Sequence, residues 1–182
     1  MTASNVDRFR QLYDAHVRAI TAYCARRTNH DRVEDAVSET FLIAWRRIVD
    51  VPDDGNALLW LYGVVHRVVG HEWRATARRR RLTTRLGSLR RATPGNPEDA
   101  AVNDDDVVRV LEAARALNPN DAEILRLVGW ERLSHDEIAK VLDLTGNAVN
   151  QRLHRARRNL AREYARLQAR PEHSTAAQEG GA

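Results

Sequence analysis

The stretch 133–160 contains two short helical patterns, the second of which carries a row of polar and basic side chains. Its apolar positions recur with helical spacing, at Val149, Leu153, Ala156 and Leu160. The opposite side of this pattern bears amide, imidazole and guanidinium groups, at Gln151, His154, Arg155, Arg158 and Arg162. Guanidinium and amide groups bind phosphate oxygens and the edges of bases through hydrogen bonds. The spacing therefore predicts an amphipathic helix whose polar face is suited to nucleic acid.

A helix start and a turn precede this basic pattern. Ser134 lies three residues before Glu137, which is the spacing of a capping box, in which each side chain bonds to the backbone N–H of the other residue. Helical spacing continues at Ile138, Ala139 and Leu142 and is interrupted at 143–145. Two short helices joined by a tight turn, the second of them basic, predict a helix-turn-helix.

A second basic surface is expected on a helix that begins near Ala57. The buried stripe of this helix is predicted at Leu61, Val64, Val65 and Val68. Its opposite face carries Arg67, Gly70, His71, Arg74, Arg78 and Arg81. Residues 67–81 hold six arginines and one acidic residue, Glu72. One or two arginines usually indicate only a solvated face, but this density favours a polyanionic partner.

Two further helices are predicted to position that surface. They run over 6–27 and 31–49, and the loop at 50–56 that follows is rich in Pro, Gly, Asp and Asn. The first helix has the apolar series Phe9, Leu12, Tyr13, Val17, Ile20 and Cys24. The second faces inward at Val33, Ala36, Val37, Phe41, Ala44 and Ile48. With the helix from Ala57 they predict a three-helix module, in which Cys24 is a small core residue.

The rest of the chain predicts a linker, a second helical module and a tail. Residues 92–106 lack periodicity and are rich in Pro, Gly, Asn and Asp, which is typical of a linker. Two predicted helices follow. The apolar residues of the first are Val107, Leu111, Ala114 and Leu117. The second begins at Asn118-Pro119, and its apolar residues are Ile124, Leu125 and Val128. No strand is required. The predicted fold class is all-α, with small helical domains at 6–82 and 106–168, a flexible acidic linker at 83–105 and a disordered tail at 169–182.

Composition and charge limit the class of protein. Of the 182 residues, 43% are hydrophobic, which suffices for packed cores, and 30% are charged. No apolar run approaches the roughly 20 residues of a membrane span, and no export signal is visible, so a cytoplasmic location is expected. Residues 60–91 carry nine basic residues and one acidic residue, whereas 92–122 carry two and seven. This distribution favours two nucleic-acid-facing modules separated by a different element.

Catalytic and metal chemistry is not indicated by the sequence. The single cysteine excludes an intramolecular disulfide and a cysteine-based zinc site. His71-Glu72 is not completed by a histidine at position 75, so the zinc-protease pattern fails. The sequence has no Walker loop, dinucleotide-binding glycine motif or serine nucleophile elbow. We therefore expect no enzymatic activity, no cofactor and no metal.

Four motifs follow one another within residues 8–165. They are FRQLYDAH, VEDAVSETFLIAW, WLYGVVHRVV followed by WR and RRRR, and LSHDEIAKVLDLTGNAVNQRLHRARRNL. In this order, with an acidic linker between the halves, they resemble the extracytoplasmic-function (ECF) sigma factors of the sigma-70 family. The resemblance implies two helical domains, sigma regions 2 and 4, that bind core RNA polymerase at its clamp and flap and read the −10 and −35 promoter elements. An anti-sigma factor is a partner that the resemblance leaves open.

The resemblance also implies site residues. The polymerase clamp helices would contact the second helix, at Asp35, Ser38, Glu39 and Phe41. The melted −10 strand would lie against the loop and the third helix, at Asp53, Asp54, Gly55, Asn56, Trp60, Arg67, His71, Arg74 and Arg78. Duplex −35 DNA would be read by the second helix of the helix-turn-helix, at Asn147, Asn150, Gln151, Arg152, His154, Arg155 and Arg158. The acidic linker would lie in the nucleic-acid channels of the polymerase.

Several positions depart from the family's pattern. The family usually has Gln where Ser38 stands, Asn where Arg67 stands and Asp where His71 stands. In the basic helix, the common Gly-Thr-Val-Lys-Ser-Arg appears as Asn-Ala-Val-Asn-Gln-Arg at 147–152. These positions read or flank bases, so the base preference of this chain does not follow from the resemblance.

Alternatives remain open for the aromatic residues and for the chain as a whole. Trp60, Tyr62 and Trp73 are suited to stacking on bases, but aromatic residues on a helix more often belong to a core. Arg67 either helps to form a pocket for a −10 base or only adds charge to the surface. A stand-alone helix-turn-helix regulator, whose first half binds a ligand or a second copy, is the alternative function. Two separate basic surfaces and an acidic linker favour the sigma factor.

Overall fold

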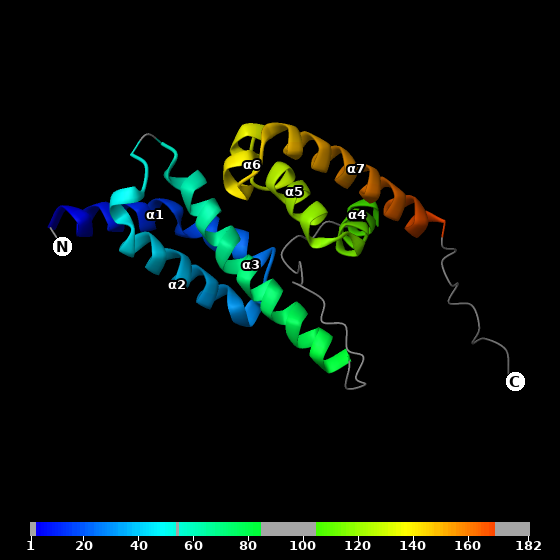
Figure 1. The fold of residues 1–182 in the computed structure, drawn as a ribbon, viewed down its shortest axis with the longest axis horizontal. Helices are drawn as coiled ribbons and strands as arrows, with labels where there is room; N and C mark the ends of the chain where they lie inside the picture. The colour runs from blue at the N-terminus through cyan, green and yellow to red at the C-terminus, as the bar shows by residue number, and fades with distance from the viewer. Residues whose placement is uncertain (1–2, 54, 85–104, 170–182) are drawn as a thin grey trace, which may run out of the picture. The chain divides into compact units, whose positions relative to one another are not determined.

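The computed structural model describes residues 3–53, 55–84 and 105–169, with side chains described for 4–53, 55–70 and 106–169 (Figure 1). Its elements in chain order are α1 (Ala3–Ala25), α2 (His30–Arg46), the short 3₁₀ helix η1 (Ile48–Asp50), α3 (Ala57–Thr84), α4 (Asp105–Ala116), α5 (Pro119–Gly129), α6 (His135–Leu142) and α7 (Gly146–Gln168). The described part of the chain contains helices, turns and loops but no strand. The predicted all-α fold class is therefore confirmed.

The chain divides into two compact units. One contains α1, α2, α3 and residues 134–145, and the other contains α4, α5 and α7. The sequence pattern groups 134–145 with the second unit instead, because it treats 133–160 as one continuous helix-turn-helix. The predicted linker at 83–105 and tail at 169–182 lie almost entirely outside the described residues, so the predicted domain boundaries stay predictions.

The core of the first unit forms where α1, α2 and α3 lie side by side (Figure 1). All four residues of the predicted stripe on α3 are at most 5% exposed, which confirms the periodicity argument. Cys24 is fully buried on α1, as predicted. The rings of Phe9 and Trp45 meet edge to face, with centroids 4.9 Å apart. Such pairs add specific geometry to the burial of apolar area, so they fix how α1 sits on α2.

A buried arginine also contributes to this core. Arg27 is 1% exposed, and its guanidinium lies 3.5 Å from the centroid of the Tyr23 ring. The Tyr23 ring in turn packs against Tyr62, with centroids 5.5 Å apart. Tyr62 is only 6% exposed. The stacking role considered for Tyr62 is therefore wrong, because its ring is already covered by the protein.

The second unit is held together along α7, which packs against both α4 and α5 (Figure 1). Asn118 caps α5 through its side-chain oxygen, which accepts from the Asp121 N–H, and Pro119 occupies the first turn. The predicted opening of this helix is thus confirmed. The inward face predicted for α4 is only partly correct, since Val107 is 36% exposed whereas Ala113 is fully buried. A small residue lets helices approach closely, so Ala113 is buried although it lies outside the predicted apolar series.

Candidate nucleic-acid interface

The helix-turn-helix begins with the predicted capping box. The Ser134 N–H donates to Glu137 Oε2 at 2.8 Å, and the Glu137 N–H donates to Ser134 Oγ at 3.3 Å. The Ser134 N–H and the Ser134 hydroxyl both donate to Glu137 Oε2, and these two bonds lower the pKa of the Glu137 carboxyl from its ordinary value. α6 ends at Leu142, its C-cap residue Asp143 has a φ of 54°, and the Leu144 N–H closes the turn on the Ala139 carbonyl at 2.9 Å. Asp tolerates this left-handed conformation better than most residues do, so a three-residue turn suffices before α7.

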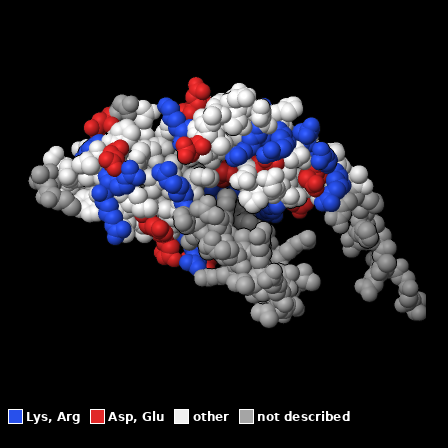
Figure 2. All heavy atoms as spheres, in the orientation of Figure 1, with Lys and Arg blue, Asp and Glu red and all other residues white. Residues whose placement is uncertain are grey.

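The outer face of α7 gathers the residues predicted to read DNA. Val149, Leu153 and Ala156 are buried, as the apolar spacing predicts. The exposed residues are Asn147, Asn150, Gln151, His154, Arg155 and Arg158, and Arg152 is half-buried. Blue basic groups gather along the band that α7 occupies in this view (Figure 2). One face of a single helix therefore presents amide, imidazole and guanidinium donors together.

Arg155 differs from its neighbours because it is bound to a buried carboxylate. Its Nη2 and Nε donate to Asp121 Oδ1 at 3.1 and 3.4 Å, while Asn159 donates to Asp121 Oδ2 at 2.9 Å. Burial raises the pKa of the Asp121 carboxyl, but hydrogen bonds from Arg155, Asn118 and Asn159 outweigh it, so the pKa is lowered overall. Sequence reasoning missed Asp121, because an acidic residue in a first helical turn usually only complements the helix dipole. No local pattern links it to a residue 34 positions later.

The second basic surface is described only in part. α3 continues without a break through the arginine tract at 78–81 to Thr84. Arg67 is exposed, and Trp60 is half-buried, with the Arg47 guanidinium 5.9 Å from its ring centroid. The side chains of His71, Trp73, Arg74 and Arg78 lie outside the described residues. These four positions therefore lie on the same helix as Arg67 and Trp60.

The loop before α3 is anchored to α1. The Arg8 guanidinium donates to the Val51 carbonyl and pairs with the Asp53 carboxylate. Gly55 has a φ of 83°, a conformation that glycine adopts without strain. Asn56 accepts a hydrogen bond from the Trp60 N–H at the start of α3, and Asp54 lies outside the described residues. Sequence reasoning found the loop but missed Arg8, since the ion pair joins residues 45 positions apart.

The outward face of α2 bears three of the four residues predicted to contact the polymerase. Asp35, Ser38 and Glu39 are exposed. Phe41 is only 3% exposed, and its ring lies 4.7 Å from the ring of Tyr13, centroid to centroid. The structure thus makes Phe41 mainly a core residue, because its ring is packed between α1 and α2, and a polymerase contact through it stays a prediction. The neighbouring Leu42, 46% exposed, is the apolar side chain that this face offers.

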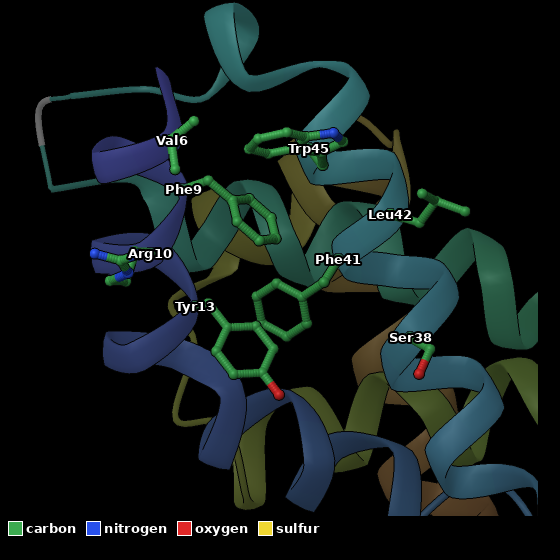
Figure 3. Close-up of a pocket in the computed structure, with 8 residues that line it drawn as sticks. All are labelled: Val6, Phe9, Arg10, Tyr13, Ser38, Phe41, Leu42 and Trp45. Atoms are coloured by element: carbon green, nitrogen blue, oxygen red, sulfur yellow. The ribbon is translucent and has the colours of Figure 1, made fainter. Parts of the chain in front are cut away.

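A groove of about 590 Å³ opens between α1 and α2 beside this face. It is lined by Val6, Phe9, Arg10, Tyr13, Ser38, Phe41, Leu42 and Trp45. Phe9, Tyr13 and Phe41 point toward one another at its centre (Figure 3). Tyr13 and Val6 are about two-fifths exposed, at 40% and 39%. The sequence pattern treated the α1 aromatics only as core and so did not predict that they also line a groove.

Two negative findings apply to the described residues. Their His, Cys, Asp and Glu side chains form no group of three or more that could hold a metal ion. None of the described helices combines the length and apolar character needed to cross a membrane.

Together these features define a class: a helical protein that combines the packed helices α1, α2 and α3 with a capped helix-turn-helix. Family models match each half of the chain, "Sigma-70 region 2" over residues 12–79 and "Sigma-70, region 4" over residues 108–160. The sigma factor CnrH of Cupriavidus metallidurans is 30% identical over 141 residues, which cover 71% of each chain. The chain belongs to the sigma-70 family of RNA polymerase sigma factors.

Further relatives agree in sequence and in fold. The ECF RNA polymerase sigma factor BldN of Streptomyces coelicolor is 30% identical over 162 residues, which cover 88% of this chain but 61% of BldN. This chain thus spans less than two thirds of the length of that relative. Among solved structures, the sigma factor RpoE of Bartonella quintana, in complex with the anti-sigma factor NepR, superposes with a TM-score of 0.66 at 21% identity. That match covers 90% of this chain and 98% of RpoE and supports the fold.

Proposed function

We propose that this chain is a dissociable subunit of RNA polymerase that binds the core enzyme and directs promoter-specific initiation. One observation carries the proposal: a region 2 match and a region 4 match occur in order in one chain, and each half presents an exposed face of different chemistry. The chain itself catalyses no reaction in this proposal, needs no cofactor and acts in the cytoplasm with the polymerase.

The outward face of α2 and the adjoining groove are the proposed polymerase-binding surface. Asp35 and Glu39 supply exposed carboxylates, which are unsuited to phosphates but complement a basic protein surface. Leu42 and the groove supply apolar area that a partner helix covers. In the family this position faces the clamp helices, and the second unit faces the flap. Ser38 lies on the same helix, one turn after Asp35, and also lines the groove.

The loop at 51–56 and α3 are proposed to hold the melted −10 strand. Trp60 offers part of an indole ring for stacking, and Arg67 offers an exposed guanidinium. Asp53, held by Arg8, keeps the loop close to α1, so Gly55 and Asn56 are presented at a fixed place. His71, Arg74 and Arg78 extend this surface along α3 in the proposal.

The outer face of α7 is proposed to enter the major groove at −35. Recognition helices contact base edges mainly through their first turns, where Asn147, Asn150 and Gln151 lie. Arg152, His154 and Arg155 follow in the next turn, and Arg158 lies one turn further on. Amides read adenine and guanidinium groups read guanine through paired hydrogen bonds, so this face has donors for more than one base.

An anti-sigma factor is a further proposed partner. RpoE of Bartonella quintana was solved with NepR, and CnrH with the cytosolic domain of CnrY. The CnrH structure superposes with a TM-score of 0.60 at 26% identity, over 90% of this chain. A protein that covers the exposed apolar groups of this chain keeps it from the polymerase.

The test is reconstitution with purified core polymerase on a promoter library with randomised −10 and −35 regions. We expect specific transcripts only when chain and core are both present, and start sites that share two elements. The alternative, a stand-alone regulator, requires that the chain alone shifts duplex promoter DNA. Tight binding of duplex DNA without core, together with no effect on initiation, would overturn the proposal.

A further inference from the structure

The Asp121 carboxylate stands out because it is charged and yet fully buried. Asn118 and Asn159 donate to its Oδ2 at 2.7 and 2.9 Å, and Arg155 donates twice to its Oδ1. A buried carboxylate requires such partners, since desolvation is costly for an unpaired charge. One anion thus ties the first turn of α5 to two successive turns of α7.

The partner of this carboxylate is far less buried than the carboxylate itself. The side chain of Arg155 is 54% exposed, whereas that of Asp121 is fully buried. Asp121 uses the Nε–H and one Nη2–H of the five guanidinium donors. The other three remain for a ligand on the solvent side. The charge-assisted pair already restricts the Arg155 side chain to one rotamer in the free protein. DNA binding therefore costs little further side-chain entropy at Arg155.

Arg158 provides an internal comparison on the same helix. It is exposed and lies three residues after Arg155, and within the described residues it forms no ion pair. A free arginine brings a full positive charge and a flexible side chain, which suits contact with phosphates. Arg155 brings an oriented fork whose charge is balanced by Asp121, which suits a bidentate contact to a base edge.

We propose that Asp121 is a positioning residue, whose carboxylate fixes the guanidinium of Arg155 so that it reads one base pair of the −35 element rather than a phosphate. This inference rests on the proposed function, because it takes the outer face of α7 as the −35 surface. It adds a residue of α5, away from the DNA face, to those that determine specificity.

The experiment uses the full chain with core polymerase and a library randomised at −35. Asp121→Asn and Arg155→Ala are each expected to flatten the preference at the same single base pair, by about 5- to 150-fold. The double variant is expected to lose no more than Arg155→Ala alone. Arg158→Ala, the matched control, lowers binding evenly across all sequences. The positioning role is overturned if Asp121→Asn leaves the preference intact, weakens all sequences evenly, or adds its full loss to that of Arg155→Ala.

A measurement on the wild-type chain covers the case in which Asp121→Asn does not fold. Nitrogen-15 relaxation at the arginine Nε is expected to give an order parameter near the rigid value of about 0.85 for Arg155 and below about 0.6 for Arg158. Equal mobility of the two side chains overturns the proposal. The two failures are distinguishable: a wild-type holoenzyme without any −35 preference refutes the proposed function, whereas a wild-type preference that survives Asp121→Asn refutes only the positioning role.

Discussion

The outward faces of α2 and α7 use charge in opposite ways. On α2, Asp35 is exposed, and its ion pair with Arg32 at 3.7 Å joins two exposed groups one turn apart. Such pairs contribute little, so the carboxylate stays available to a partner. On α7, Arg155 is bound to a carboxylate with no exposed surface. The first face has loosely held charge beside an apolar groove, and the second has oriented charge on a polar helix.

This difference indicates which kind of partner each face suits. A protein partner recovers free energy mainly from apolar area, and charges at the rim steer the encounter. Leu42 and Tyr13 are 46% and 40% exposed in the free chain, and both line the groove. DNA instead presents hydrogen-bond acceptors at fixed positions. Donors that are already oriented therefore bind them at a smaller cost in side-chain entropy.

The largest effect is expected from reversing the charge of the α2 face. Asp35→Arg together with Glu39→Arg should abolish co-purification with core polymerase, because two carboxylates that complement a basic surface become repulsive. Circular dichroism should show an unchanged helical content, since both side chains are exposed. Glu112→Arg reverses an exposed acidic residue of α4, in the other unit, and as the matched control it should retain polymerase binding. Normal co-purification of the double variant would contradict this assignment.

A second prediction separates the core from the contact surface at two adjacent residues. Phe41→Ala should lower the free energy of unfolding of the first unit by about 3–5 kcal/mol, because it opens a cavity among the aromatic rings. Leu42→Ala should leave unfolding almost unchanged but weaken polymerase binding about 5-fold, since it removes half-exposed apolar area. Thermal melts and a polymerase binding titration measure the two effects. The opposite pattern would restore Phe41 as the contact residue.

Features encoded by neighbouring residues were predictable from the sequence. The capping box of Ser134 and Glu137, the Asn118-Pro119 helix start and the buried stripe of α3 all occur as predicted. Each depends on residues within one or two helical turns, where spacing alone determines geometry. The exposed face of α7 was predictable for the same reason.

Features that depend on packing between distant segments were not predictable. The Arg155–Asp121 and Arg8–Asp53 pairs join residues 34 and 45 positions apart, and no spacing rule reaches that far. For Phe41 the apolar periodicity did predict an inward-facing ring, and only the resemblance implied a polymerase contact there; its packing against Tyr13 agrees with the periodicity. The sequence therefore predicts which helix faces are polar, but not which polar groups are already bound.

The buried carboxylate should make the second unit sensitive to acid. The folded pKa of Asp121 is lowered, so its ionisation stabilises the folded state above the unfolded pKa of about 3.9. That stabilisation is lost as the pH falls through the still lower folded pKa. The protection factors of the α5 and α7 amides, taken relative to the intrinsic exchange rate at each pH, should therefore fall as the pH is lowered below about 5 in the wild type, with a smaller change in Asp121→Asn. Since Glu137 also has a lowered pKa, only the difference between the two chains tests Asp121.

A smaller and more local effect is expected at Arg67. Arginine cannot accept a hydrogen bond, whereas asparagine both donates and accepts, so a pocket lined by Arg67 should favour a base edge rich in acceptors, such as guanine. Arg67→Asn should shift the preferred base at one −10 position in a randomised promoter library. Since Arg67 is exposed, the fold should not change. An even loss across all −10 sequences, or no change at all, would leave Arg67 as surface charge only.

The smallest effect is expected at Arg158, the free counterpart of Arg155. Without this phosphate contact, DNA binding releases about one fewer counterion. The magnitude of the slope of log affinity against log salt should therefore decrease by about 1 in Arg158→Ala. The preference among −35 sequences should stay the same, because a phosphate contact carries no sequence information. Filter-binding titrations of the holoenzyme at several salt concentrations measure both quantities. A changed base preference with an unchanged salt slope would mean that Arg158, and not only Arg155, reads a base, and the contrast between a free and a fixed arginine would fail.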